Sequence, residues 1–247
     1  MSVAPSPSPS PSPYAETLPA PALRGVVRRL WTYRAPHAPV APVQVLPDGC
    51  VDLIWDGQRL FVAGPDPVAM EATLAPGACL TGVRLAPGAA RAVLGLPLHE
   101  LTGQRVAMAA LWGRPAAALE AELQRAAAPA EALLAAIARR ASAPDRTMAQ
   151  LFARLAEGDA PRVAALAREL GSSERGLRRH CQEHFGYGAK TLDRILRLQR
   201  LLACARRSRT LTEAALAAGY ADAAHLVHDA RQLTGLAPGE LVRRHAD

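Results

Sequence analysis

Residues 163–186 read VAALARELGSSERGLRRHCQEHFG, and this stretch decides the fold of the C-terminal part of the chain. A short helix with one apolar side ends at Gly171, the residue type that most often follows a helix in the left-handed conformation. After a tight turn, Ser173 is the N-cap residue of a second helix. Apolar residues at intervals of four predict the buried side of that helix: Leu177, Cys181 and Phe185. The stretch therefore predicts a helix-turn-helix.

The other side of this second helix is polar and strongly basic. Arginine and glutamine side chains hydrogen-bond to base edges in the major groove, and the second helix of a helix-turn-helix enters that groove. We therefore predict that this side binds DNA, through Ser173, Glu174, Arg175, Arg178, Arg179 and Gln182.

A second unit of the same kind follows a long helix, which we expect at about residues 189–207. A short apolar helix over 211–218 ends at Gly219, and Asp222 then caps another helix. Each unit thus has a short helix, a glycine, a capping residue and a second helix. The pattern predicts two helix-turn-helix units joined by one long helix.

The charge of the chain is concentrated at the same end. The net charge of the 247 residues is +7, and residues 146–247 hold 17 basic and 11 acidic side chains. Residues 1–145 hold 12 basic and 11 acidic side chains and are nearly neutral. A basic excess confined to one part is typical of a nucleic-acid-binding domain, and a solvated helical face has the same composition.

The first half of the chain has a different pattern. Residues 1–20 begin with a Ser-Pro alternation and are predicted to form a disordered tail. Residues 21–112 contain short Val- and Leu-rich runs between turn residues, which is typical of antiparallel β-structure, and a helix is expected over 106–112. Consecutive runs are expected to pair as hairpins: 43–46, 50–55 and 59–63.

Residues 113–145 are rich in alanine and predict two helices, at about 115–127 and 130–141. Each helix has one apolar side, formed by Leu119, Leu123, Leu133, Leu134 and Ile137. Two interpretations stay open. Either the helices pack on the β-rich part, or they form an inter-domain connector or dimerisation element.

The second unit also carries specific motifs, with GYADAAHL at 219–226 and TGLAPG at 234–239. Together with 163–186, these motifs resemble the AraC/XylS family of bacterial transcription regulators over roughly 161–244. The resemblance implies a DNA-binding domain with two recognition helices that enter successive major-groove segments on one face of the duplex.

In the second recognition helix, the residues that the resemblance places toward DNA are Ala223, Ala224, Val227, His228 and Arg231. Alanine and valine side chains cannot hydrogen-bond, so we expect the first helix to carry most base readout. The second helix would contact thymine methyl groups and the backbone. The chain departs from the family at Cys181, Leu226 and Ala230, where aromatic residues are usual, and this predicts a thinner core in the second unit.

The N-terminal half resembles the β-rich sensory domain of some family members, through 46–54 and 82–89. This resemblance implies a small barrel related in shape to cupins. The metal site of a cupin needs clustered histidines and a carboxylate, but this half holds only His37 and His99, so we expect no metal and no cofactor. The predicted fold class is α+β, with a small β-barrel-like domain with appended helices followed by an all-α domain.

These observations predict a sequence-specific transcription regulator modulated by a small-molecule effector. The expected partners are double-stranded DNA, that effector, RNA polymerase and a second copy of the chain as a homodimer. No apolar run reaches the roughly 18 residues that a membrane helix needs, and the N-terminus has Ser-Pro repeats where a signal peptide would need an apolar core, so we expect a cytoplasmic protein without membrane contact.

Three other functions are less consistent with the sequence. An enzyme is disfavoured, because the chain has no G-x-S-x-G, H-E-x-x-H or glycine-rich phosphate loop. A DNA-damage or redox sensor would use a reactive cysteine, Cys50 or Cys79, but neither has an obvious cationic neighbour in the sequence. A purely architectural DNA-binding protein would not explain the polar recognition helix or the separate β-rich part.

Overall fold

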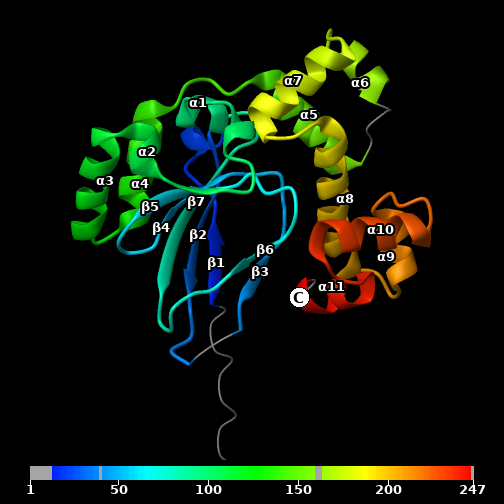
Figure 1. Cartoon of the computed structure of the whole chain (residues 1–247), viewed down its shortest axis with the longest axis horizontal. Coiled ribbons are helices and arrows are strands. Elements are labelled where there is room, and N and C mark those ends of the chain that lie inside the picture. Colours follow the sequence, from blue (N-terminus) through cyan, green and yellow to red (C-terminus); the bar gives the residue numbers. More distant parts are fainter. Residues whose placement is uncertain (1–12, 39–40, 159–162, 246–247) are drawn as a thin grey trace, which may run out of the picture.

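The computed structural model describes residues 13–38, 41–158 and 163–245. A β-rich part is followed along the chain by a helical part, and the two lie side by side (Figure 1). The first part combines strands and helices, whereas the described residues of the second form helices and their connections without a strand, which confirms the predicted α+β class. No helix within the described residues is long and apolar enough to cross a membrane.

Six strands form one antiparallel sheet in the order β1-β2-β7-β4-β5-β8. They are β1 (Tyr14–Thr17), β2 (Val27–Arg34), β7 (Cys79–Leu85), β4 (Asp52–Trp55), β5 (Leu60–Ala63) and β8 (Arg105–Ala107). The central strands bury Leu53, Val62 and Val83 completely. Among the described residues β1 and β8 do not pair with each other, so the sheet does not close into a barrel there.

Strand β1 corrects the expected extent of the N-terminal tail. Tyr14–Thr17 pairs along its whole length with β2, and the rings of Tyr14 and Trp31 lie with their centres 6.0 Å apart. The chain therefore joins the sheet from Tyr14 onward. All four residues of β1 are exposed at the sheet edge, so they lack the apolar alternation by which a sequence signals a strand. The earlier part of the expected tail, residues 1–12, lies outside the described residues.

A second, two-stranded sheet pairs β3 (Val43–Val45) with β6 (Met70–Ala72). The hairpin expected between residues 43–46 and 50–55 is therefore wrong, whereas the hairpin between β4 and β5 is confirmed. The turn residues at 47–49 do separate two strands, but those strands belong to different sheets, and β4 pairs instead with β7.

Four helices and two short 3-10 turns complete the β-rich part. They are η1 (Pro21–Leu23), α1 (Ala90–Leu94), η2 (Leu98–Glu100), α2 (Met108–Trp112), α3 (Arg114–Arg125) and α4 (Pro129–Arg140). The helix expected over 106–112 begins only at Met108, because Arg105–Ala107 is strand β8.

Helices α3 and α4 pack on the β-rich part. Leu133 and Ile137 are fully buried, and they share one apolar core with Leu53 and Val83 of the sheet. The packing that the first interpretation of residues 113–145 expects is therefore present, and the inter-domain connector or dimerisation element stays a prediction. Leu133 and Ile137 cannot also present an exposed dimerisation face.

The helical part has its own apolar core. Its helices are α5 (Arg146–Glu157), α6 (Val163–Glu169), α7 (Glu174–Phe185), α8 (Ala189–Ala205), α9 (Leu211–Ala217), α10 (Ala223–Thr234) and α11 (Pro238–His245). The hydroxyl of Ser173 accepts a hydrogen bond from the Gly176 N–H (3.0 Å), and the carboxylate of Asp222 accepts one from the His225 N–H (2.7 Å). Both caps confirm the predicted helix starts.

Candidate nucleic-acid interface

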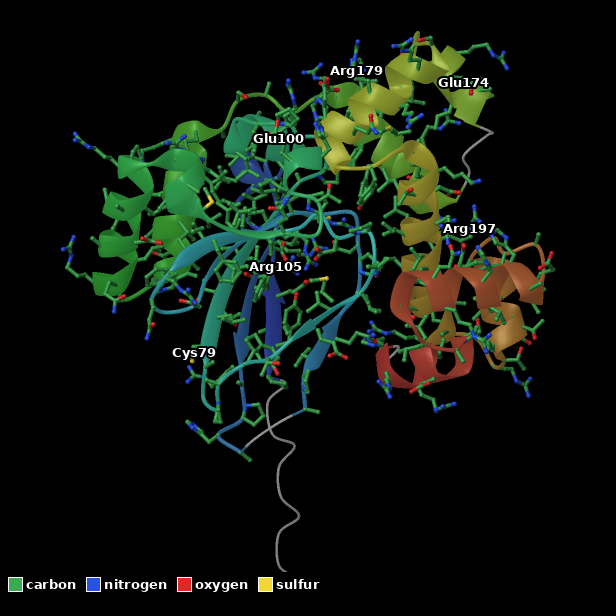
Figure 2. The ribbon with its side chains drawn as sticks, viewed as in Figure 1. Cys79, Glu100, Arg105, Glu174, Arg179 and Arg197 are labelled. Carbon is green, nitrogen blue, oxygen red and sulfur yellow. The ribbon has the colours of Figure 1, made fainter. Side chains whose placement is uncertain are left out.

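Helix α7 places the predicted DNA-binding side chains on its outer side. Ser173 and four of the predicted residues on α7 are exposed and Gln182 is half-buried, whereas the predicted stripe Leu177, Cys181 and Phe185 is buried in the core. In Figure 2, Glu174 and Arg179 lie at the top of the view, far from the sheet. The structure therefore brings together, on the outer side of α7, the six residues that the sequence singled out. The contact of these side chains with bases stays a prediction.

Helix α10 presents a different surface. A shallow hollow of about 460 Å³ runs along it, lined by Ala223, Ala224, Val227, His228, Arg231 and Gln232. The first five are the residues predicted for this recognition helix. Small apolar side chains line the hollow beside basic and polar ones, so the surface suits apolar contact with methyl groups more than hydrogen-bonded base readout. The positions at which the family usually has aromatic residues, Cys181, Leu226 and Ala230, are buried core positions here.

Arginines of α8 hold α10 in place. Nε of Arg194 lies 2.7 Å from an oxygen of Asp229, a residue only 1% exposed, and the same guanidinium donates to Oε1 of Gln232 at 2.7 Å. Nη1 of Arg197 lies 3.0 Å from Nε2 of His225. Since these charges are committed to contacts inside the protein, they contribute less to DNA binding than the net charge of this part suggests.

The sequence did not indicate this role, because helical spacing along residues 189–205 does not show which residues the arginines contact. Arg200 of α8 is also committed to contacts inside the protein, because its guanidinium donates hydrogen bonds to the carbonyl oxygens of Leu155 and Ala218. A buried acid that falls on a facing helix, such as Asp229, is the signal that could have identified the pairing.

The β-rich part contacts the end of α7. The Thr102 hydroxyl donates to the carbonyl oxygen of Gly186 (3.1 Å), directly after the helix. An oxygen of Asp145 lies 3.6 Å from Nε2 of His184, and Arg91 of α1 lies 3.8 Å from Glu183. Burial lowers the pKa of His184, and the carboxylate of Asp145 opposes that shift. The first recognition helix is therefore anchored at its C-terminal end.

The second recognition helix is anchored in the same manner. The carbonyl oxygens of the last turn of a helix have no partner within the helix. In α10 two of them accept hydrogen bonds from the β-rich part, since the Ala69 N–H donates to Leu233 (2.7 Å) and the Gln44 side chain donates to Thr234 (2.9 Å). The β3–β6 ribbon thus holds this end of α10.

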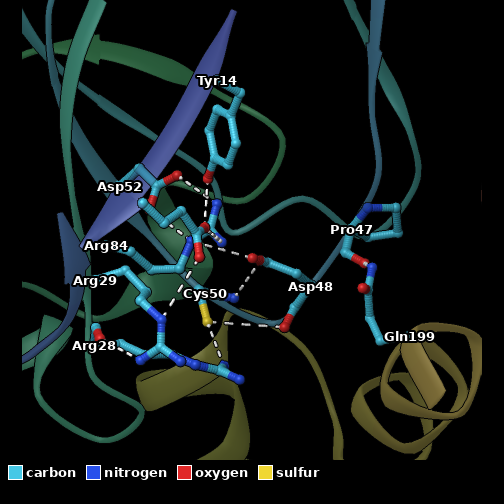
Figure 3. A network of polar contacts seen from close by, with 10 residues as sticks. Tyr14, Arg28, Arg29, Pro47, Asp48, Cys50, Asp52, Arg84 and Gln199 are labelled. Carbon is cyan, nitrogen blue, oxygen red and sulfur yellow. Dashed lines mark hydrogen bonds and ion pairs between the residues drawn. The ribbon is translucent and has the colours of Figure 1, made fainter. Parts of the chain in front are cut away.

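Between these two contacts, residues 46–50 press against α8. The Gln199 side chain donates to the carbonyl oxygen of Pro47 (2.7 Å), and Gly49 lies directly beside Leu192 and Phe152. Behind this loop lies a network of charged groups (Figure 3). In it, Arg84 binds both oxygens of Asp52 at 3.1 Å and also lies 3.2 Å from Asp48.

Cys50 belongs to this network. Its Sγ lies 3.2 Å from Nη1 of Arg28. Burial raises the pKa of the Cys50 thiol to about 12, an effect that the nearby Asp48 reinforces and Arg28 opposes. Cys50 is therefore protonated at neutral pH, which disfavours the reactive-cysteine alternative at this position. Within the described residues, no group of three or more histidine, cysteine or acidic side chains could hold a metal ion.

Two family models match the chain, one in each part. A family model described as "Domain of unknown function (DUF6597)" matches residues 15–107, and one described as "Helix-turn-helix domain" matches residues 166–244. No curated protein matches the chain.

Two solved structures are similar to the chain. A probable AraC family transcriptional regulator from Rhodopseudomonas palustris CGA009 is 24% identical, over 41% of this chain and 98% of its own, with a TM-score of 0.35. The apo form of a ToxT variant from Vibrio cholerae strain SCE256 is 11% identical, over 87% of this chain and 93% of its own, with a TM-score of 0.43. Both TM-scores are low, so the class to which this protein belongs is assigned from the two family models alone.

The paired helix-turn-helix units and the matching family model define a DNA-binding transcription regulator. Its helical part is an AraC-type helix-turn-helix domain, which is joined to an N-terminal DUF6597 domain.

Proposed function

We propose that α7 is the main sequence-reading element of this regulator. The observation that carries the proposal is the exposed outer side of α7, where Arg175, Arg178 and Gln182 follow one another at intervals of three and four residues. Such side chains stand one above another on a helix, so they can contact consecutive base pairs. Helix α10 then adds apolar contacts and grip on the backbone through His228 and Arg231.

The proposal is tested by selecting bound sequences from random DNA with the full chain. Replacing Arg178 with alanine is expected to cost roughly 1–3 kcal/mol on the selected site and much less on random DNA. Arg125→Ala is the control, because Arg125 is an exposed arginine of α3 in the other part of the chain. If Arg178→Ala weakens specific and random binding equally, Arg178 contacts phosphate and the assignment of α7 is wrong.

We further propose that residues 146–247 read DNA and that the preceding part, including the helices of 113–145, senses a small-molecule effector. The contacts of the β-rich part with the ends of α7 and α10 support this division, because they connect the sensing part directly to both recognition helices. A ligand can act through these contacts only if it binds one arrangement of the two parts more tightly than another.

The remaining partners belong to the same proposal. A homodimer would place two DNA-binding parts on paired sites and raise the affinity through effective concentration. Because Leu133 and Ile137 are buried, its interface lies on other surfaces. Contact with RNA polymerase would allow the regulator to change the rate of transcription. A bacterial regulator of this kind works beside the chromosome, in the cytoplasm.

A further inference from the structure

The hollow of about 460 Å³ on α10 changes in chemical character along the helix. Three apolar residues line its N-terminal half, and the residues of its C-terminal half are polar or basic: Ala223, Ala224 and Val227, followed by His228, Arg231 and Gln232. A recognition helix contacts base edges mainly with its N-terminal residues. The half of the hollow that would face the bases therefore offers methyl groups, which cannot form hydrogen bonds.

Polar side chains around this half are engaged within the protein. The carboxylate of Asp222 caps the helix, and Nε2 of His225 lies 3.0 Å from a nitrogen of Arg197. A glutamine recognises adenine through both its amide oxygen and its amide nitrogen. In Gln232 the oxygen already accepts a hydrogen bond from Arg194, at 2.7 Å. These contacts leave apolar packing as the main means by which α10 can distinguish one base from another.

The basic half of the hollow suits the DNA backbone. His228 and Arg231 are exposed, and neither forms an ion pair with another residue that the structure describes. A guanidinium group pairs with a phosphate through two parallel hydrogen bonds. Contacts with phosphates position a helix on the duplex without reading its sequence. This half would therefore hold the apolar half against the base edges.

The apolar half fits one chemical group of the major groove. Thymine presents its C5-methyl group there, and small apolar side chains contact that methyl group. The base 5-methylcytosine carries the same group at the same ring position. The two bases differ in the neighbouring group, which is an acceptor oxygen in thymine and a donor amino group in cytosine. Only a side chain that forms hydrogen bonds can detect that difference, and alanine and valine do not.

We propose that α10 recognises the C5-methyl group itself, in thymine and in 5-methylcytosine alike. Methylation of a cytosine in the segment under α10 then raises the affinity of the regulator for its operator. The inference rests on the proposed function, because it needs α10 in the major groove. It goes further by naming the chemical group that is read, the residues Ala224 and Val227 that read it, and a DNA modification to which the regulator responds.

The test is a competition binding assay with the full chain and the site selected from random DNA. Each thymine of the site is replaced in turn by deoxyuridine, which removes only the methyl group. At least one replacement is expected to weaken binding about fourfold, the effect of one buried methyl group. At the same position, a pair of 5-methylcytosine and guanine should bind about fourfold more tightly than the unmethylated cytosine–guanine pair.

Variants of the hollow locate the methyl contact. Val227→Ala removes part of the apolar surface, and Ala224→Ser introduces a hydroxyl group. Each is expected to reduce both methyl effects to about twofold or less. Leu216→Ala is the control, because Leu216 is a 64% exposed apolar residue of α9 outside the hollow, and it should keep both effects. Thermal unfolding of each variant confirms that it is folded, and the exposed position of Ala224 keeps the test valid if Val227→Ala is not.

Three results overturn the proposal. They are a site in which deoxyuridine replaces every thymine without loss of affinity, methyl effects that persist in both hollow variants, and sensitivity to the methyl group of thymine without sensitivity to that of 5-methylcytosine. Failure of the proposed function has a different signature. In that case Arg178→Ala weakens binding to the selected site and to random DNA equally on unmodified DNA, whatever the methyl effects are.

Discussion

Gly49 offers a direct test of how the two parts of the chain pack together. It lies in the loop that presses against α8, with a backbone φ of +77°. A Cβ atom added at this position would lie 2.9 Å from Cδ1 of Leu192 and 3.0 Å from Cε2 of Phe152. Both neighbours belong to the apolar core of the helical part, so the methyl group of an alanine would act as a wedge between the two parts.

The expected cost of Gly49→Ala has two components. A left-handed backbone conformation costs a residue with a side chain roughly 1–2 kcal/mol. Overpacking of a well-filled core costs about 1–3 kcal/mol more. Gly57→Ala separates the two, because Gly57 has a φ of +91° but nothing within 4 Å of an added Cβ. Gly57→Ala should therefore show the backbone cost alone.

The measurement is urea denaturation of the full chain, followed by far-ultraviolet circular dichroism. Gly49→Ala is expected to lose about 1–3 kcal/mol more free energy of unfolding than Gly57→Ala. Its DNA affinity should also change, because the wedge displaces α8, which carries α10. If the two variants lose equal stability, Gly49 does not face Leu192 and Phe152, and the arrangement of the two parts described above is wrong.

Two further predictions concern titratable groups. Burial lowers the pKa of His184 below its ordinary value of 6.5, so this side chain binds a proton more readily in the unfolded chain than in the folded one. The contribution of His184 to the free energy of unfolding is therefore fully present above about pH 6.5. It is lost as the pH falls through the lower pKa of the folded state. His184→Asn should flatten this dependence in urea denaturation at about pH 7 and pH 5, and an unchanged pH profile would contradict it. A thiol reagent should label the exposed Cys79 long before Cys50 and Cys181, whose pKa values burial raises to about 12. Labelling of Cys50 at the rate of Cys79, measured by peptide mass spectrometry, would show that the loop at 46–50 opens.

The helical part could be predicted closely because its signals are local. Capping residues such as Ser173 and Asp222 act on N–H groups only three residues away, and the structure confirms both. The sheet could be predicted only in part, because strand pairing is not local. β3 finds its partner β6 across two intervening strands, and no residue in 43–45 indicates that choice. The partner of Arg194 could not be predicted for the same reason, because Asp229 is 35 positions away along the chain.

The contacts of the β-rich part with α7 and α10 share one property that bears on regulation. In α7 the anchored groups are Glu183, His184 and the carbonyl oxygen of Gly186, and in α10 they are the carbonyl oxygens of Leu233 and Thr234. All of these lie at C-terminal ends, whereas a helix-turn-helix contacts bases mainly through the N-terminal residues of its recognition helix. The β-rich part therefore leaves the N-terminal ends of both helices exposed. A change in this part would alter the angle and spacing of the two helices on DNA rather than cover them, so an effector would change affinity for the paired site more than for either half alone.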